Sequence, residues 1–303
     1  MSRDSGPPRT DKTATVRVLQ LRQQTFEPKR LIIMAIVNRT PDSFYSPGET
    51  WDEQAAMESV GAAVTAGAEI IDIGGVPAAP GPPVELAEEL RRTVPFVAAV
   101  RAAYPDLVIS IDTWRHEVAA EACDAGADLI NDTWGGWDSE LYEVAARFSV
   151  GIVCSHVGNQ PPRTRPFRVA YDDVVADVLD RTLALAQRAV DLGVDPSRIL
   201  IDPAHDFGKN TWHSLEITRR LDEMVATGWP VLVSVSNKDF IGETLGVDLD
   251  NRSTGTLATV SVCAWLGARV FRVHDAGAVR QALDTVSAVR GDTPPDRAIR
   301  GLA

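Results

Sequence analysis

Cysteine and long apolar runs are both scarce in this chain. Its three cysteines, Cys123, Cys154 and Cys263, are far apart and lie in apolar stretches. An odd and dispersed set of this kind does not suit a disulfide framework, so we expect buried, reduced thiols. No apolar run reaches the roughly 18 residues that a membrane-spanning helix requires. We therefore expect a cytoplasmic protein that does not span a membrane.

Positive charge is also in short supply. The 30 Lys and Arg residues are outnumbered by 42 Asp and Glu, which gives a net charge of −12. Nucleic-acid backbones and anionic membranes attract clustered Lys and Arg, so this balance disfavours both as partners. Any anionic ligand has to bind in a local basic pocket. The composition is otherwise ordinary, with 45% hydrophobic residues, and can support a large core.

Short apolar runs without polar alternation recur along the chain, separated by helical stretches. A strand that is apolar on both faces is typical of a parallel sheet covered by helices. The order is therefore strand, helix, strand throughout. We predict eight strands, at residues 31–37, 70–73, 107–111, 128–130, 151–154, 199–201, 231–235 and 270–273. The main predicted helices are 52–66, 84–103, 116–125, 172–192 and 253–266.

Glycines at the helix exits support the same pattern. A glycine follows the helical stretch at positions 67, 126, 193, 228 and 267, where a left-handed residue can end a helix before the next strand. Repeated units of this kind predict an α/β fold, a single-domain (β/α)8 TIM barrel over residues 29–291. Residues 1–28 form an N-terminal tail or edge segment and 292–303 a C-terminal tail. A doubly wound sheet is the alternative, but no G-x-G-x-x-G follows any strand.

Polar residues close all of the predicted strands. In a barrel of this kind, side chains at the carboxyl ends of the strands point toward the ligand site. One aspartate after a strand can simply cap the next helix, but polar groups at every strand end indicate a binding site. These residues are Asn38, Asp72, Asp112, Asn131, Ser155, His156, Asp202, Ser236, Asn237, Lys238, Arg272 and His274.

Two groups can be distinguished within this set by charge. Asp112, Asn131 and Asp202 offer acceptors that suit a flat ring edge with adjacent N–H and NH2 donors, and Lys238 can donate to a ring carbonyl. The second group, Asn38, Arg272 and His274, forms a cationic corner that suits a phosphate or diphosphate, with Mg2+ as an option on the amide oxygen of Asn38. The alternative for Arg272 is an ion pair with a strand-end aspartate.

The order and spacing of these residues resemble the dihydropteroate synthases, from about residue 31 to 289. That family joins a pterin methyl diphosphate to p-aminobenzoate in folate synthesis. The resemblance rests on Asn38-Arg39-Thr40-Pro41-Asp42-Ser43-Phe44, Asp72-Ile73-Gly74-Gly75, Ser110-Ile111-Asp112-Thr113, Ile130-Asn131-Asp132, Asp202-Pro203, Phe207-Gly208-Lys209, Ser236-Asn237-Lys238 and Arg272-Val273-His274.

The resemblance implies where each ligand binds. The pterin is expected on Asp112, Asn131, Asp202 and Lys238. The diphosphate and Mg2+ are expected near Asn38, Arg272 and His274, and the aminobenzoate near Phe207 and Ser236. Sulfonamide or sulfone inhibitors, which need mainly Phe207, Ser236 and Lys238, are possible partners. A homodimer that pairs through the outer helices is also implied.

The two loops that close over the site depart from the family. After Gly75 the family has Glu-Ser-Thr-Arg-Pro-Gly, but here residues 76–81 read VPAAPG, so alanines stand in place of the Thr and Arg that reach the substrates. The family's Ser-Asp-Gly-Gly after Phe44 is Tyr-Ser-Pro-Gly here, and Pro47 restricts the loop. The catalytic residues are therefore unknown, and Asp72 is the one candidate that remains.

Losses of this kind weigh heavily on catalysis. Each lost electrostatic contribution to a transition state costs about a hundred-fold or more in rate. We expect a homologue with a pterin-type pocket whose synthase activity is absent or strongly reduced. The alternatives are a working synthase with rebuilt loops, in which Arg39, Glu49 or His205 compensates, and a pterin-binding methyltransferase-like barrel.

One further basic stretch follows the fifth strand. Residues 160–168 include Arg163, Arg165 and Arg168. We interpret this stretch as a solvated loop rather than a phosphate clamp. Replacement cations for the altered loops are the alternative role.

Overall fold

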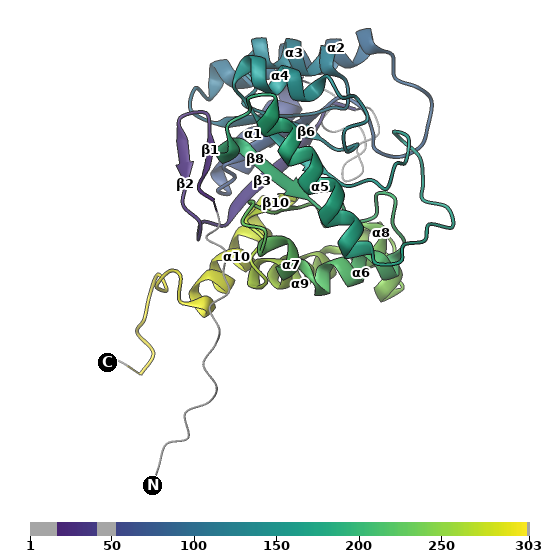
Figure 1. The fold of residues 1–303 in the computed structure, drawn as a ribbon. Coiled ribbons are helices and arrows are strands. Elements are labelled where there is room, and N and C mark those ends of the chain that lie inside the picture. The colour runs from purple at the N-terminus through teal and green to yellow at the C-terminus, as the bar shows by residue number, and fades with distance from the viewer. Residues whose placement is uncertain (1–16, 41–52, 302–303) are drawn as a thin grey trace.

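A computed structural model describes residues 17–40 and 53–301 of the chain. Eight parallel strands form one sheet in the order β8-β7-β6-β5-β4-β3-β10-β9, and a parallel bridge from Ile201 to Val231 joins its two edges. The predicted (β/α)8 barrel is confirmed (Figure 1). The strands are β3 Ile32–Asn38, β4 Ile70–Gly74, β5 Val108–Asp112, β6 Leu129–Asp132, β7 Gly151–Ser155, β8 Ile199–Asp202, β9 Leu232–Val233 and β10 Val270–Val273.

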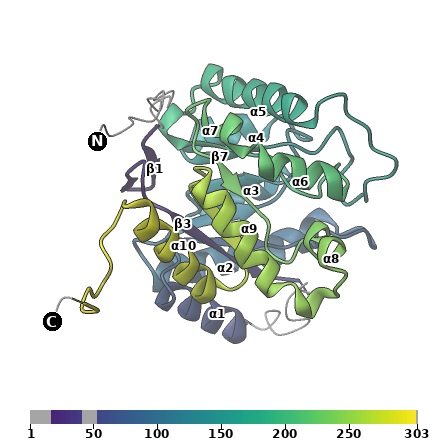
Figure 2. The ribbon, with the colours of Figure 1, turned by 90° about the horizontal axis from the view of Figure 1, so that it is seen from below.

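Helices surround the strands on the outside, as Figures 1 and 2 show from two directions. They are α1 Glu53–Thr65, α2 Leu86–Ala103, α3 His116–Asp124, α4 Leu141–Phe148, α5 Val174–Asp191, α6 Thr211–Arg219, α7 Leu221–Val225, α8 Asp239–Leu245, α9 Ser253–Trp265 and α10 Ala276–Arg290. The five predicted helices are all present. The glycines predicted at helix exits adopt positive φ, for example +115° at Gly126, which confirms their role in ending helices.

Apolar side chains form two separate layers. The larger one lies between the strands and the helices, and Ile33, Ile71 and Ile109 are fully buried in it. The smaller one fills the inside of the barrel, where Ile32, Ile70 and Val108 point inward. Because successive residues of a strand point to opposite faces, an uninterrupted apolar strand supplies both layers. This explains why the strands lack polar alternation.

The floor of the barrel is closed by a hairpin that the sequence analysis did not predict. Strands β1 (Leu19–Leu21) and β2 (Gln24–Phe26) pair antiparallel, within the segment that the sequence assigned to a tail or edge. Leu19, Leu21 and Phe26 are buried against the inner apolar layer of the barrel. The hairpin therefore completes the core at the end of the barrel opposite the strand carboxyl ends.

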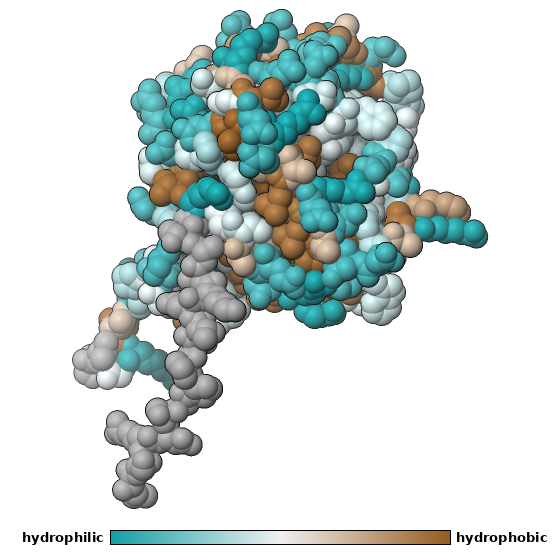
Figure 3. All heavy atoms as spheres, in the orientation of Figure 1, coloured by the Kyte–Doolittle hydropathy of each residue, from teal (hydrophilic) through white to brown (hydrophobic). Residues whose placement is uncertain are grey.

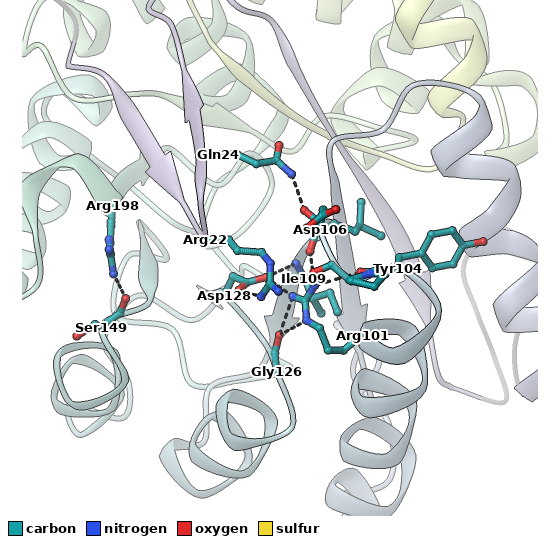
Figure 4. A network of polar contacts seen from close by, with 12 residues as sticks. Arg22, Gln24, Arg101, Tyr104, Asp106, Ile109, Gly126, Asp128, Ser149 and Arg198 are labelled. Carbon is teal, nitrogen blue, oxygen red and sulfur yellow. Dashed lines mark hydrogen bonds and ion pairs between the residues drawn. The ribbon is translucent and has the colours of Figure 1, made fainter.

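Polar contacts fix this hairpin to the floor (Figure 4). Arg22 donates to Asp128 over 3.3 Å, and Gln24 donates to the carbonyl of Asp106 over 2.6 Å. Asp128 in turn accepts from Arg101 and from the backbone amide of Ile109. The hairpin therefore covers one end of the barrel, and the end with the strand carboxyl termini is not covered by it.

The remaining general expectations can be compared with the structure directly. Cys123, Cys154 and Cys263 are buried and form no disulfide. Among the described residues, no helix combines the length and apolarity that a membrane span requires. Hydrophilic side chains cover most of the face shown in Figure 3.

Candidate functional site

A cavity of about 300 Å³ opens at the carboxyl ends of the strands. Side chains from β3, β5 and β10 form its base, and the loops that follow β4, β6, β7 and β8 form its walls. The sequence-predicted residues that line it are Asn38, Asp112, Phe207, Ser236, Asn237, Lys238, Arg272 and His274. The structure therefore brings most of the predicted site together at the mouth of the barrel.

Five of the predicted residues do not line this cavity, among them Ser155 and His156, which are each 1% exposed. Asp72 is fully buried, and Asn131 and Asp202 are 1% and 3% exposed. The side-chain amide of Asn131 donates to Asp72 over 3.1 Å. A ligand that uses these groups has to displace part of the wall above them or reach them through a deeper extension of the cavity.

Arg272 holds two of the strand-end carboxylates together. Its Nε donates to Asp72 over 2.6 Å, and its Nη2 donates to Asp112 over 2.6 Å. Burial lowers the pKa of Arg272, but the two carboxylates outweigh this, so the net pKa is raised and the side chain stays charged. The alternative role that the sequence left open for Arg272, an ion pair with a strand-end aspartate, is present.

Asp112 has both of its carboxylate oxygens engaged. One accepts from Arg272 and the other from the hydroxyl of Thr133. Burial raises the pKa of Asp112 to about 6, although the neighbouring Arg272 acts in the opposite direction. At neutral pH the group remains mostly ionised and can still accept hydrogen bonds from N–H donors of a ligand.

Asp202 organises the loop that follows β8. Its carboxylate accepts from the backbone amide of Ala204 over 2.7 Å, and burial raises its pKa to about 6. The loop turns sharply, since both Ala204 and Asp206 have positive φ. Lys209 fixes it from below by donating to the carbonyls of His156, Ala204 and Phe207.

Lys238 and Phe207 form a second contact in the cavity. The Nζ atom of Lys238 lies 4.1 Å from the centre of the Phe207 ring, a cation–π arrangement. Burial lowers the pKa of Lys238. The edge of Trp134 packs on the same ring, with centroids 5.0 Å apart.

The cationic corner expected from the sequence differs from the arrangement observed. Burial, together with Arg272 and Lys238, lowers the pKa of His274 to about 3, so its imidazole is neutral at pH 7. Its Nδ1 lies 3.0 Å from the hydroxyl of Ser236. With Arg272 paired to two aspartates, the corner carries less positive charge than its residue types suggest.

Two of the three residues suggested as replacements for the altered loops do not line the cavity. His205 is fully buried, bonds to Thr218 over 3.0 Å and stacks on Phe240. The guanidinium of Arg39 lies over the ring of Phe96, 4.6 Å from its centre. Glu49, like the Tyr-Ser-Pro-Gly stretch of the first loop, lies outside the described residues.

The loop after β4 contributes an apolar wall. Its residues Val76, Pro77, Ala78, Ala79 and Pro80 all line the cavity. Neither alanine can donate a side-chain hydrogen bond or carry charge. The substitutions noted in the sequence therefore fall on the wall of the ligand cavity itself.

Sequence reasoning missed several groups that shape the site. Thr133 bonds to Asp112, and Trp114 lines the wall. Thr133 follows the predicted strand 128–130 and lies two residues after Asn131, so its position near a strand end was an available signal. Arg252 also lines the cavity and donates to Asp239, but it begins a helix and follows no strand.

Comparisons with known proteins agree with this geometry. Residues 34–274 match the family described as pterin binding enzyme. A protein of Mycobacterium leprae (strain TN) named inactive dihydropteroate synthase 2 is 55% identical over 278 residues, 90% of this chain and 96% of that protein. A dihydropteroate synthase of Streptococcus pyogenes is 37% identical over 259 residues, 84% of this chain and 94% of that protein. The crystal structure of the Yersinia pestis dihydropteroate synthase in complex with a sulfonamide drug superposes with a TM-score of 0.86 at 33% identity, covering 91% of this chain and all (100%) of that one.

Proposed function

Because the chain belongs to the family of pterin-binding enzymes, we propose that it binds a pterin-type ligand in the cavity while its dihydropteroate synthase activity is absent or strongly reduced. Relatives named inactive dihydropteroate synthase 2 are more similar to it than the dihydropteroate synthase of Streptococcus pyogenes. Both the retained polar residues at the base of the cavity and the altered wall at residues 76–80 support this proposal.

The observation that carries the proposal is the wall at residues 76–80. Ala78 and Ala79 line the cavity where the resembling family has Thr and Arg that reach the substrates. A synthase needs positive charge near the departing diphosphate, because charge develops there in the transition state. Loss of one such group costs about a hundred-fold or more in rate. Binding of the ground-state ligand depends less on these groups, so it can persist.

The pterin is assigned to the polar residues at the base of the cavity. Asp112 lines the cavity, while Asn131 and Asp202 lie just beneath it. Their oxygens suit the adjacent N–H and NH2 donors of an aminopyrimidinone ring, and Lys238 can donate to its carbonyl. Phe207 and Ser236 remain for an aromatic second ligand or a sulfonamide.

A diphosphate with Mg2+ fits the corner formed by Asn38 and His274. A side chain on Gly74 would bring its Cβ to 3.5 Å from Oδ1 of Asn38, so the bare glycine keeps space beside this oxygen. Mg2+ usually binds few protein oxygens together with phosphate oxygens, which suits a single amide ligand. Bound there, the ion would neutralise charge on the diphosphate.

One assay pair tests the proposal. Pterin diphosphate is titrated by calorimetry, and product formation from pterin diphosphate and p-aminobenzoate with Mg2+ is measured on the same sample. We expect binding without robust turnover. Turnover at the rate of an active synthase measured in parallel would instead establish a working synthase with rebuilt loops, and absence of binding would reject the pterin pocket.

We also propose that the chain forms a homodimer through its outer helices. Val262 and Trp265 on α9 and Val289 on α10 are 47%, 56% and 69% exposed. Helices α9 and α10 pack side by side, so these apolar residues lie on neighbouring helices. Light scattering of the eluted protein would identify a monomer or a dimer.

A further inference from the structure

The loop between β7 and α5 contacts the altered wall of the cavity. Arg163 donates from Nε to the carbonyl of Ala79 over 3.1 Å and from Nη1 to the carbonyl of Pro82. The expectation of a solvated loop is wrong for Arg163, because its guanidinium bridges two loops. In Figure 1 this loop is the teal-green trace that leaves the body of the barrel before α5.

The glycine at position 81 leaves room for the guanidinium of Arg163. A Cβ on Gly81 would approach Nη2 of Arg163 to 2.8 Å, closer than non-bonded atoms allow. The loop is also fixed at its two ends. Tyr171 donates to the carbonyl of Gly208 over 2.7 Å, and Arg181 donates to the side chain of Asn159. Four hydrogen bonds therefore hold the loop beside the cavity.

The bridge places the next residues on the cavity wall. Thr164, Arg165 and Pro166 line the same cavity as Ala78 and Ala79. The side chains of the wall at 76–80 are apolar, so the positive charge beside them comes from another segment, where Arg163 already contacts the backbone of Ala79. Arg165 supplies a positive charge from the loop before α5.

Arg165 differs from the other cations that line the cavity. Arg252 and Arg272 are paired with aspartates, and Lys238 lies over Phe207. Across the ranges 17–40 and 53–301, Arg165 is exposed and makes no hydrogen bond or ion pair. It is a guanidinium at the mouth of a cavity whose charge no carboxylate of the described residues neutralises.

The surroundings indicate what this cation recognises. Trp114, Trp134 and Phe207 give the cavity aromatic walls, and Ala78 and Ala79 leave it wide. A flat apolar body fits between such walls, with an acidic group directed to the mouth. Arginine binds carboxylates in a planar, bidentate geometry.

We propose that Arg165 binds the carboxylate of an aromatic acid at the cavity mouth and that Arg163 positions the loop that carries it. Arg165 thereby brings a cation from the loop before α5 to the part of the cavity assigned to the second ligand, which is separate from the stabilisation of a departing diphosphate. The proposal deepens the proposed function, on which it rests for the presence of a second ligand beside the pterin. It requires no remaining catalysis.

The test compares 4-aminobenzoate with its neutral analogue 4-aminobenzamide by calorimetry on the full chain, with and without the pterin ligand. We expect the wild type to prefer the acid. Arg165→Ala should lower the affinity for the acid about ten-fold, which corresponds to one charge-assisted hydrogen bond of about 1.4 kcal/mol. The affinity for the amide should not change. Arg165→Lys should restore part of the preference.

Two further variants separate positioning from general damage. Arg163→Ala should lower the affinity for the acid but not for the amide. The double variant with Arg165→Ala should bind the acid little more weakly than Arg165→Ala alone, because both changes remove the same contact. Arg168→Ala is the matched control: it lies in the same loop, over the ring of Phe167, and does not line the cavity. It should bind both compounds as the wild type does.

Several outcomes would overturn the proposal. These are an unchanged affinity of Arg165→Ala for the acid, an equal loss for acid and amide, or no binding of the acid to the wild type. Failure of the proposed function appears separately, in the titration with the pterin ligand. If pterin does not bind but acid preference still depends on Arg165, only the pterin assignment fails.

Discussion

Arg272 on β10 and Asp112 on β5 form an ion pair with a distance of 2.6 Å between nitrogen and oxygen. The family resemblance assigns these two residues to opposite ends of one ligand, Asp112 to the pterin and Arg272 to the diphosphate. In the structure they neutralise each other. A ligand that uses both has to exchange this pair for contacts of its own.

Replacement of Arg272 should destabilise the fold. Arg272→Ala leaves the fully buried Asp72 without its cation, a change that typically costs about 3–5 kcal/mol. The free energy of unfolding from urea titration measures it. Arg220→Ala is the control, because that arginine pairs with carboxylates on the surface, where solvent screens the charges, and its loss should cost clearly less. Equal losses in the two variants would contradict a structural role for the Arg272 pair.

Replacement of Asp202 should abolish pterin binding. Asp202→Ala removes an acceptor assigned to the ring edge, and calorimetry with the pterin ligand measures the loss. The carboxylate also accepts from the amide of Ala204, so Asp202→Asn provides a second variant that keeps an acceptor for this bond. Unchanged affinity in both variants would show that the cavity serves another ligand.

Gly208 should tolerate substitution far less than Gly193. Both have positive φ, at +61° and +101°, so an alanine costs about 1–2 kcal/mol at either position. Only at Gly208 would the new Cβ also meet a neighbour, the carbonyl oxygen of Val157 at 2.2 Å, while nothing lies within 4 Å at Gly193. Gly208→Ala should therefore cost about 1–3 kcal/mol more in urea unfolding. Similar costs at the two positions would show that this loop relaxes readily.

Acid should weaken the fold partly through His205. Burial lowers its pKa to about 3, whereas the unfolded chain takes up a proton near 6.5. The unfolded state therefore binds more protons between these values, and the stability present above pH 6.5 is lost as the pH falls toward 3. The loss reaches about 2 kcal/mol near pH 5.

The variant His205→Gln checks this assignment. Glutamine cannot take up the proton, so urea unfolding between pH 7 and pH 5 should show a shallower loss than in the wild type. The bond to Thr218 can be kept by the amide. An identical pH slope would assign the acid sensitivity to other groups.

A sulfonamide should bind even without turnover. Phe207, Ser236 and Lys238 all line the cavity, and the related Yersinia pestis enzyme was crystallised with such a drug. Titration of the wild type should show binding, and Lys238→Met should weaken it by removing the cation over the Phe207 ring. A null titration with the wild type would count against a retained second-ligand site.

The barrel could be predicted because its causes are local. Each strand is apolar on both faces, and glycines such as Gly126 mark where helices end. The polar strand ends followed from the same geometry, since parallel strands deliver their last residues to one edge. Spacing along the chain therefore predicted several of the polar residues that line the cavity, such as Asn38, Asp112 and Arg272.

What the sequence did not reveal depends on contacts between distant segments. The hydrogen bond from Arg163 to Ala79 joins residues 84 positions apart, and no sequence pattern in either loop predicts it. The buried positions of Asn131 and Asp202 depend on how side chains pack above them. The floor hairpin at Leu19–Phe26 was missed because its strands have three residues each, too short for a periodic signal.

The floor of the barrel sets an order on folding. Arg269 donates to the carbonyl of Arg17, 252 positions earlier, and to that of Phe26. On the ribosome the hairpin is synthesised before the barrel strands, yet it can dock only after nearly all of the barrel has emerged. The hairpin is thus made before the barrel strands but gains its native contacts among the last, and its apolar side chains lack their native partners during synthesis.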